Sequence, residues 1–339
     1  MTAVPLATEY VGGGREPVTT SMKRTLLIGL GLLGVICAGA LASPSRITLH
    51  FPPGAEGTRP ADPERTARIA ADIEHLSVTL GERNHHRPYE LRQAEKWAEE
   101  RLQSLGWTIT RQRVDDVADN LIATRGEASG PLVIVGAHID TALGTPGADD
   151  NASGVAALLE LARDPALGAT DGELRLVVFA NEEPPYFQTD EMGSRVYAES
   201  LVGAEVRGMM ALESIGYYTE EPGTQKWPMG LGIILPRTGN FLMFVGNPQS
   251  SRLVQRVLRA YRGEASLAAA AATVPGALPG VDWSDHAEFW RIGAQAVMVT
   301  DMPPNRNPHY HEPTDLPPTI DPARISAAID GLAAAISVM

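Results

Sequence analysis

Short apolar runs alternate with helical patterns over most of the chain. The apolar runs suit buried strands and occupy residues 132–135, 174–179, 208–212, 230–235 and 296–300. Between them, apolar residues at helical spacing predict helices over 154–162, 195–201 and 251–261. Strands that alternate with helices predict an α/β three-layer sandwich, in which helices flank a central, mostly parallel, mixed β-sheet.

Further helices are predicted on either side of this region. Asp62 followed by Pro63 is a helix start, and a second helix is expected over 88–105. A last helix closes the chain, with an apolar face formed by Ile325, Ile329, Leu332 and Ile336. We therefore expect one folded domain over residues 62–339.

The N-terminal part has a different pattern. Lys23 and Arg24 precede an uncharged apolar run over residues 25–42, which is typical of an export signal. The sequence Ala40-Leu41-Ala42 has the small-residue spacing of a signal-peptidase site, and the run is also long enough to span a bilayer. Both a cleaved signal peptide and a transmembrane anchor are compatible with it.

The distribution of basic residues predicts the topology. A basic pair before the apolar run, with no similar cluster just after it, places residues 1–24 in the cytoplasm and the rest of the chain outside. The protein is thus expected to be exported, either anchored in the membrane or periplasmic or secreted. Residues 43–61 contain many Pro and Gly and are predicted to be a flexible tether.

Composition narrows the possible functions. The chain has 339 residues, of which 44% are hydrophobic, so it can bury a sizeable core. Its net charge of −13 argues against a nucleic-acid partner, because phosphate binding requires a basic face. Cys37 is the only cysteine, which excludes an intramolecular disulfide and leaves any metal site to His, Asp and Glu.

Acidic and histidine side chains follow three of the predicted strands. These residues are His138, Glu182 with Glu183, and Glu213. In α/β sheets, ligand sites gather at the carboxyl ends of parallel strands. A buried carboxylate such as Glu213 would be costly unless a cation met it. Because side chains of adjacent residues diverge at a strand end, one of Glu182 and Glu183 can bind a metal while the other faces the reacting water.

Two further segments add candidate ligands. Asp150 lies in a Gly-rich stretch just before a helix, and Asp140 is placed to fix the tautomer of His138. Asp149 is expected only to cap that helix. In the Pro-rich segment near the C-terminus, spacing alone leaves His309 and His311 as alternatives.

Imidazole and carboxylate are the ligands that zinc takes in sites that keep a position open for water. The candidate His, Asp and Glu ligands are numerous enough to bind two ions about 3.5–4 Å apart. The sequence therefore predicts a two-zinc hydrolase.

The ordered series of motifs resembles the co-catalytic zinc aminopeptidases, relatives of bacterial leucyl aminopeptidases, glutaminyl cyclases and the glutamate carboxypeptidase and transferrin receptor ectodomains. The resemblance covers about residue 62 to the C-terminus. It implies two Zn²⁺ ions and a peptide substrate with a free N-terminus. It assigns the metal ligands as His138 with Glu213, Glu183 with His311, and Asp150 as the bridge between them.

The resemblance also implies roles for residues around the ligands. Glu182 matches the general base of the family, and the motif that selects His311 over His309 makes Asp315 a second-shell partner. Ser284-Asp285-His286 matches a segment near the active site, with Asp285 beside the metals. The implied activity is that of an aminopeptidase.

Two features depart from the family pattern and other activities stay open. The position of Glu213 is often aspartate, and the connection over 184–192 is longer than expected, which bears on specificity. The alternatives are a glutaminyl cyclase, which uses one zinc, a carboxypeptidase or amidohydrolase of the same fold, and a membrane-tethered binding module without catalysis. Retention of Glu182 together with all the ligands argues against the last.

Overall fold

The computed structural model describes residues 48–339 apart from 52, 54–56, 58–59, 126–129, 166, 168–171 and 228–231. By its internal contacts the chain divides into Met1–Pro44 and Ser45–Met339, and the second unit is described below. The predicted cytoplasmic segment, the apolar run over 25–42 and the start of the tether lie outside the described residues. Within the described part, no helix has both the length and the apolar character needed to cross a membrane.

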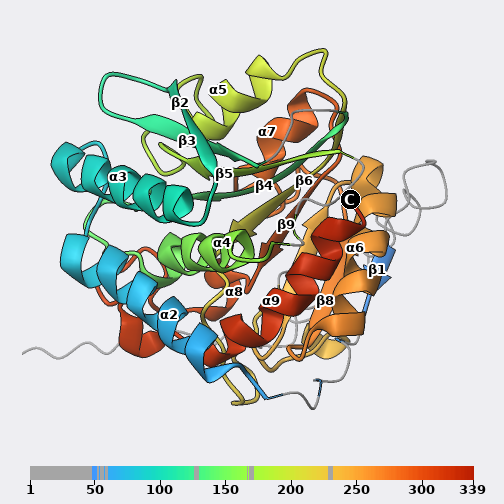
Figure 1. The fold of residues 1–339 in the computed structure, drawn as a ribbon. Coiled ribbons are helices and arrows are strands. Elements are labelled where there is room, and N and C mark those ends of the chain that lie inside the picture. Colours follow the sequence, from blue (N-terminus) through green and yellow to red (C-terminus); the bar gives the residue numbers. More distant parts are fainter. Residues whose placement is uncertain are drawn as a thin grey trace, which may run out of the picture. The chain divides into compact units, whose positions relative to one another are not determined.

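One nine-stranded sheet forms the centre of this unit (Figure 1). Its strands run in the order β1 (Thr48–His50), β8 (Ala269–Thr273), β7 (Leu242–Gly246), β9 (Ala296–Thr300), β6 (Val206–Glu213), β4 (Leu132–His138), β5 (Glu173–Phe179), β3 (Asp119–Thr124) and β2 (Thr108–Arg113). The central strands β9, β6, β4 and β5 are parallel to their neighbours in this group, and antiparallel strands extend the sheet on both sides. The carboxyl ends of the four central strands therefore meet at one edge.

Helices cover both faces of the sheet (Figure 1). One face packs against α2 (Pro63–Glu74), η1 (His75–Leu80), α3 (Pro88–Ser104), α4 (Gly154–Ala162), α6 (Ser251–Glu264) and α9 (Pro322–Ser337). The other face packs against α5 (Gly193–Ser200) and α7 (His286–Arg291). Alternation along β4 sends Val133 and Val135 into the first layer and Leu132 and Ile134 into the second. The predicted three-layer α/β sandwich is confirmed.

Short helical turns connect these elements on the sheet edges. They are η2 (Ala148–Ser153), η4 (Pro248–Ser250), α8 (Pro303–Arg306) and η5 (Pro317–Thr319). Of these, η2 matters most for function, because it directly precedes α4 and carries Asp150.

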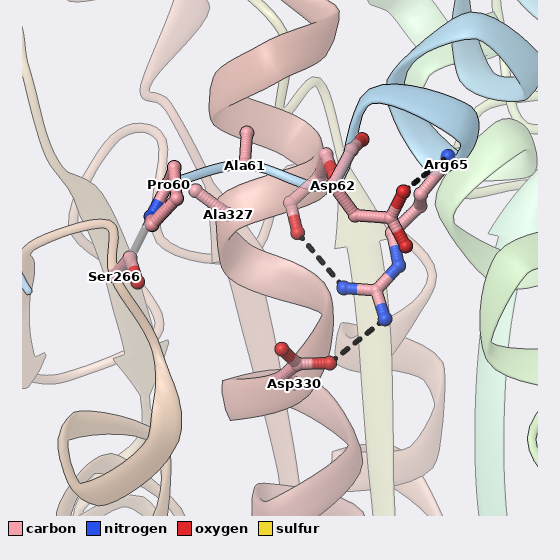
Figure 2. A pocket seen from close by; sticks show the side chains of 8 residues that line it. Pro60, Ala61, Asp62, Arg65, Ser266, Ala327 and Asp330 are labelled. Carbon is pink, nitrogen blue, oxygen red and sulfur yellow. Dashed lines mark hydrogen bonds and ion pairs between the residues drawn. The ribbon is translucent and has the colours of Figure 1, made fainter. Parts of the chain in front are cut away.

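The first helix begins where the sequence predicts and is fastened to the last one (Figure 2). The Asp62 carboxylate accepts hydrogen bonds from the backbone N–H groups of Glu64 and Arg65, which caps α2. Arg65 in turn reaches α9, where its Nη2 lies 2.9 Å from Asp330 Oδ1 and its Nη1 donates to the carbonyl of Ser326. A hollow of about 230 Å³ lies beside this connection.

Part of the predicted tether belongs to the sheet. Thr48–His50 forms β1 and pairs antiparallel with β8, with Leu49 opposite Ala272. An edge strand is held mainly by backbone hydrogen bonds, so it needs no apolar pattern of its own, and the surrounding Pro and Gly residues concealed it. The described strands thus include one that precedes Asp62.

The strand predicted over 230–235 is wrong for its described residues. Residues 232–235 lie in a turn, where the side chains of Ile233 and Ile234 point into solvent. The strand between β8 and β9 in the sheet is β7, which was not predicted. An apolar run of this length does not distinguish a buried strand from an exposed turn.

Three other strands also escaped the sequence analysis. β8 consists almost entirely of alanine, a residue depleted in strands, yet all of its residues are buried. β2 and β3 have mixed polar and apolar residues because β2 lies at the sheet edge and exposes much of its length. For β8, tertiary packing outweighs the low strand preference of alanine.

Candidate metal centre

Three parallel strands deliver polar side chains to one edge of the sheet. His138 is the last residue of β4 and Glu213 the last of β6, while Glu182 and Glu183 follow β5 after two further residues. All four side chains are buried. The sheet topology explains their meeting, since parallel strands end on the same side.

Asp150 lies between two imidazole rings. Its Oδ1 is 3.2 Å from His138 Nε2 and its Oδ2 is 3.1 Å from His311 Nε2. His138 Nε2 is also 3.2 Å from Glu213 Oε2, and His311 Nε2 is 3.3 Å from Glu183 Oε1. Two groups result, His138 with Asp150 and Glu213, and Asp150 with Glu183 and His311, each with ligand atoms within 4.8 Å of one another.

The donor atoms of these groups suit metal ions. His138 Nε2, Asp150 Oδ1 and Glu183 Oε1 are buried and have no hydrogen-bond partner among the described residues. Leaving such atoms unpaired costs free energy that coordination to a cation would offset. Imidazole nitrogen with carboxylate oxygen is a donor set that zinc accepts, so the residues present fit a metal pair with Asp150 shared between the ions.

The pKa values of the cluster show how strongly its charges interact. Burial and the negative charge of Asp150 raise the pKa of Glu183 to about 8. Burial alone would lower the pKa of His311, but its contacts with Asp150 and Glu183 outweigh burial and raise the pKa to about 10. Burial also acts to lower the pKa of His138, but the negative charges of Glu213 and Glu182 outweigh burial and raise it. Without other cations, protonated imidazoles are needed to balance the carboxylates.

Asp140 lies against both the Glu182–Glu183 backbone and the ring of His138. Its Oδ1 accepts a hydrogen bond from the backbone N–H of Glu182 at 3.1 Å, and its Oδ2 accepts one from Glu183 at 3.0 Å. The same carboxylate lies 3.5 Å from His138 Nδ1. Asp140 therefore holds the Glu182–Glu183 backbone beside His138.

Asp315 acts on the backbone of the bridging residue. Its carboxylate accepts hydrogen bonds from the N–H groups of Asp149 at 2.9 Å and Asp150 at 3.2 Å. The resemblance implied a second-shell role for Asp315, and these hydrogen bonds hold the backbone of Asp150. Burial and the charge of Asp149 raise the pKa of Asp315 to about 8.

Hydroxyl groups orient Glu213 from both sides. Ser214 Oγ donates to Glu213 Oε1 at 2.9 Å, and Ser284 Oγ donates to Oε2 at 2.8 Å. Asp285, next to Ser284, is buried, and its burial raises its pKa to about 7. Asp285 belongs to neither metal group.

The structure separates the two histidines that spacing left as alternatives. His311 belongs to the cluster, whereas His309 Nδ1 lies 2.9 Å from Thr314 Oγ1 and His309 belongs to neither metal group. Asp149, which was expected to cap a helix, is instead buried. It accepts hydrogen bonds from the backbone N–H of Gly216 and the side chain of Asn307. Asp149 therefore connects η2 to the loop after β6 and to the segment that contains Asn307.

Two residues of the site were missed by the sequence analysis. The guanidinium of Arg83 is fully buried and donates to backbone carbonyls around the cluster, including those of Ile139 and Gly147. Tyr310 stacks on His311 with ring centroids 3.8 Å apart. Burial and the nearby carboxylates, first Asp150, raise the pKa of Tyr310, so its hydroxyl stays protonated. In the sequence, the one signal for Tyr310 was its position next to the candidate ligand His311.

The connection over 184–192 begins directly at Glu183 and borders the cluster. Its Tyr186 ring packs edge-on against His85 with centroids 5.3 Å apart. Gln188 Nε2 donates to the carbonyl of Asp282, and Asp190 Oδ1 lies 3.0 Å from Arg195 Nη1. This segment is therefore fixed at three points next to the metal groups.

Comparisons with known proteins agree with this geometry. The sequence pattern of peptidase family M28 matches residues 120–336. The uncharacterized protein YfbL of Escherichia coli (strain K12) is 37% identical over 81% of this chain and 87% of that protein. The probable lipoprotein aminopeptidase LpqL of Mycobacterium tuberculosis is 30% identical, over 65% of this chain and 45% of that protein.

Solved structures share the fold. The zinc aminopeptidase BSAP from Bacillus subtilis superposes with a TM-score of 0.63 at 15% identity, covering 81% of this chain and 94% of that one. A glutaminyl cyclase from Tannerella forsythia gives a TM-score of 0.60 at 19% identity, covering 80% and 98%. Since the family pattern spans most of the sheet and every residue of both metal groups, this chain belongs to peptidase family M28.

Proposed function

We propose that this protein is a di-zinc aminopeptidase that releases residues from the free N-terminus of peptides. The observation that carries the proposal is the position of Asp150, whose two carboxylate oxygens face different imidazoles at 3.2 and 3.1 Å. A carboxylate in this position serves two ions, each completed by its own histidine and glutamate.

The charges of the ligands suit two divalent ions. His138, Asp150 and Glu213 would hold one zinc, and Asp150, Glu183 and His311 the other. The three carboxylates offset most of the charge of two Zn²⁺ ions while the imidazoles bind neutral. When bound, the two ions polarise the scissile carbonyl and lower the pKa of the attacking water.

Glu182 is proposed as the general base. It belongs to neither metal group, and its Oε2 lies 3.9 Å from His138 Nε2, so it borders the ligands without being one of them. Its backbone is fixed by Asp140. In this position the Glu182 carboxylate takes the proton of the attacking water and passes it to the leaving amine.

Tyr310 is proposed to donate a hydrogen bond to the oxygen of the scissile carbonyl. Its high pKa keeps the phenol protonated, and its ring is held by stacking on His311. A donor placed where negative charge develops stabilises the transition state more than the ground state.

The Asp285 carboxylate is proposed to receive the substrate ammonium. It lies in the buried acidic region and outside both metal groups, and Glu182 is assigned to proton transfer. Blocking the α-amine removes a charge-assisted hydrogen bond worth on the order of 1.5–3 kcal/mol, which corresponds to roughly 10- to 150-fold in rate. The test is to compare an aminoacyl-nitroanilide with its N-acetyl form. Equal kcat/KM values would reject the aminopeptidase assignment and favour a carboxypeptidase or amidohydrolase.

A glutaminyl cyclase is the second candidate, because a glutaminyl cyclase shares the fold over most of this chain. The completeness of both metal groups favours the two-zinc enzyme. Metal analysis of the purified protein and an assay with an N-terminal glutaminyl peptide distinguish the two. One zinc per chain together with ammonia release would identify a cyclase, and two zinc ions with no turnover of any of these substrates would indicate a binding module.

We further propose that the peptidase domain lies outside the cytoplasm. The basic pair and apolar run before residue 43 support this topology. Protease added to spheroplasts of cells expressing the full chain should degrade the domain if it is anchored outside, and periplasmic extraction should release it if the signal is cleaved. A domain that is retained in spheroplasts and protected from protease contradicts the proposal.

A further inference from the structure

An exposed apolar surface contains no residue of the metal groups and is not used by the proposed chemistry. Ile233 is 90% exposed and Ile234 is 73% exposed, the two highest values among the large hydrophobic residues described. Leu49 on β1 is 54% exposed. We call Leu49, Phe51, Ile233, Ile234 and Leu235 the apolar patch. Neighbouring exposed isoleucines are unfavourable in water, so a contiguous patch of this kind indicates a contact surface.

Aromatic residues hold the patch in place. Phe51 packs edge-on against Trp227 with ring centroids 5.5 Å apart and against Phe241 at 6.4 Å. Trp227 Nε1 donates to the carbonyl of Pro236 at 2.6 Å, which fixes the turn that carries Ile233. Phe51 and residues 232–237 line one surface hollow of about 470 Å³. The patch is thus a supported surface in which the β1 end and the turn lie together.

Leu49 and Phe51 lie on the same side of the sheet. Residues two apart along extended chain point to the same face, and Phe51 packs with Ala270 and Ala272 of β8. This face is opposite the layer formed by α2, α6 and α9, which packs against Ala269 and Ala271. The patch therefore extends from the first strand of the domain across to the turn.

The length of chain before β1 limits how far this patch can lie from the predicted apolar run. The predicted apolar run ends at Ala42, and β1 begins at Thr48, so residues 43–47 alone connect them. A fully extended segment of this length reaches at most about 18 Å. If the run spans the bilayer, the beginning of β1 stays close to the membrane surface, and Phe51 and the turn beside it stay close as well.

We propose that the apolar patch inserts into the membrane interface next to the N-terminal segment and so holds the peptidase domain against the bilayer. Exposed Lys226 and Arg237 flank residues 232–235 in the sequence, and cationic side chains favour anionic headgroups. Trp227 beside them has the amphipathic character typical of residues at membrane interfaces. The proposal rests on retention of the predicted anchor and is independent of the reaction catalysed.

Spin-label accessibility on the full chain tests this proposal. Cys37, the only native cysteine, is replaced by serine, and single cysteines are introduced as Ile233→Cys and, as a control, Val78→Cys. Val78 is 52% exposed on η1, in the layer on the opposite face of the sheet. Both labelled chains are reconstituted into vesicles of phosphatidylcholine and phosphatidylglycerol, and collisions with oxygen and with a polar nickel complex are measured.

Contact with lipid predicts that the label at residue 233 gains oxygen collisions and loses nickel collisions relative to the label at residue 78, because oxygen concentrates in hydrocarbon and the nickel complex is excluded. Similar accessibility at both positions would show that the patch faces water. Low accessibility to both reagents at 233 would show that protein, such as a second copy, covers it. A chain that does not float with the vesicles would overturn the proposal at the first step.

Discussion

The adjacent residues Glu182 and Glu183 provide the sharpest test of the proposed division of roles. Both side chains are buried, and both backbone N–H groups are held by Asp140, so a Glu→Gln change at either position preserves size and backbone contacts. Only Glu183 belongs to a metal group, with Oε1 3.3 Å from His311 Nε2. The two variants are therefore matched controls for one another.

Glu182→Gln should remove turnover and leave the metal in place. The loss of a general base lowers kcat by about 10²–10⁴-fold, which corresponds to roughly 3–5.5 kcal/mol of transition-state stabilisation. KM should change little, because the amide keeps the shape of the carboxylate and the metals still meet the carbonyl.

Glu183→Gln should instead weaken metal binding. An amide oxygen carries no full charge and therefore binds a cation less strongly than a carboxylate does. Changing a residue that only hydrogen-bonds to a metal ligand already lowers metal affinity about 10–100-fold, so changing the ligand itself should lower it at least as much. After dialysis against a weak chelator, this variant should hold less zinc than the parent, and added zinc should restore part of its activity.

The measurements are zinc content by atomic emission and initial rates with an aminoacyl-nitroanilide. Zinc loss or full activity in Glu182→Gln would refute its assignment as base. Two tightly bound zinc ions in Glu183→Gln would refute its assignment as ligand.

Three further predictions concern the metals and the stability of the domain. Asp150→Ala should lower the zinc content by more than one site, because this carboxylate faces both histidines; full two-zinc occupancy would contradict the bridge. Arg83→Met should lower the free energy of unfolding by at least about 3 kcal/mol, since the change leaves several buried carbonyls without a donor, and urea denaturation monitored by circular dichroism measures this. Burial lowers the pKa of His286 to about 4, below its unfolded value of about 6.5; its contribution to stability is therefore fully present above pH ~6.5 and is lost as the pH falls through about 4. The urea midpoint of His286→Gln should depend less on pH over this window than that of the parent, and equal slopes would show that His286 does not contribute to this dependence.

The positions of the ligands on the strands were open to prediction because they follow from local pattern. A buried parallel strand is a continuous apolar run, so its end is visible in the sequence, and the polar residues after 132–135, 174–179 and 208–212 had to gather at one sheet edge. The beginning of α2 at Asp62 and the extent of α4 were visible for a similar reason, since caps and helical periodicity are local.

Contacts between segments far apart in the chain were not visible. The resemblance implied a second-shell role for Asp315, but that its carboxylate holds the backbone of Asp150 was not visible, because no spacing rule relates residues so distant. Arg83 looks like any surface arginine in the sequence and becomes the donor to buried carbonyls only after the chain has folded. The apolar residues at 233 and 234 suggested a strand, although the sheet position was taken by Leu242–Gly246.

The sequence by itself determined the fold class and the set of polar residues at the strand ends, because these depend on periodicity and on which residue types can be buried. The tertiary structure decided which of the polar residues meet. It placed His311 rather than His309 against Asp150, turned the two oxygens of Asp150 toward different imidazoles, and added β1, β2, β3, β7 and β8 to the sheet. These outcomes depend on packing between distant segments, where a weak local preference is outweighed by burial and by backbone hydrogen bonds that only the folded chain can form.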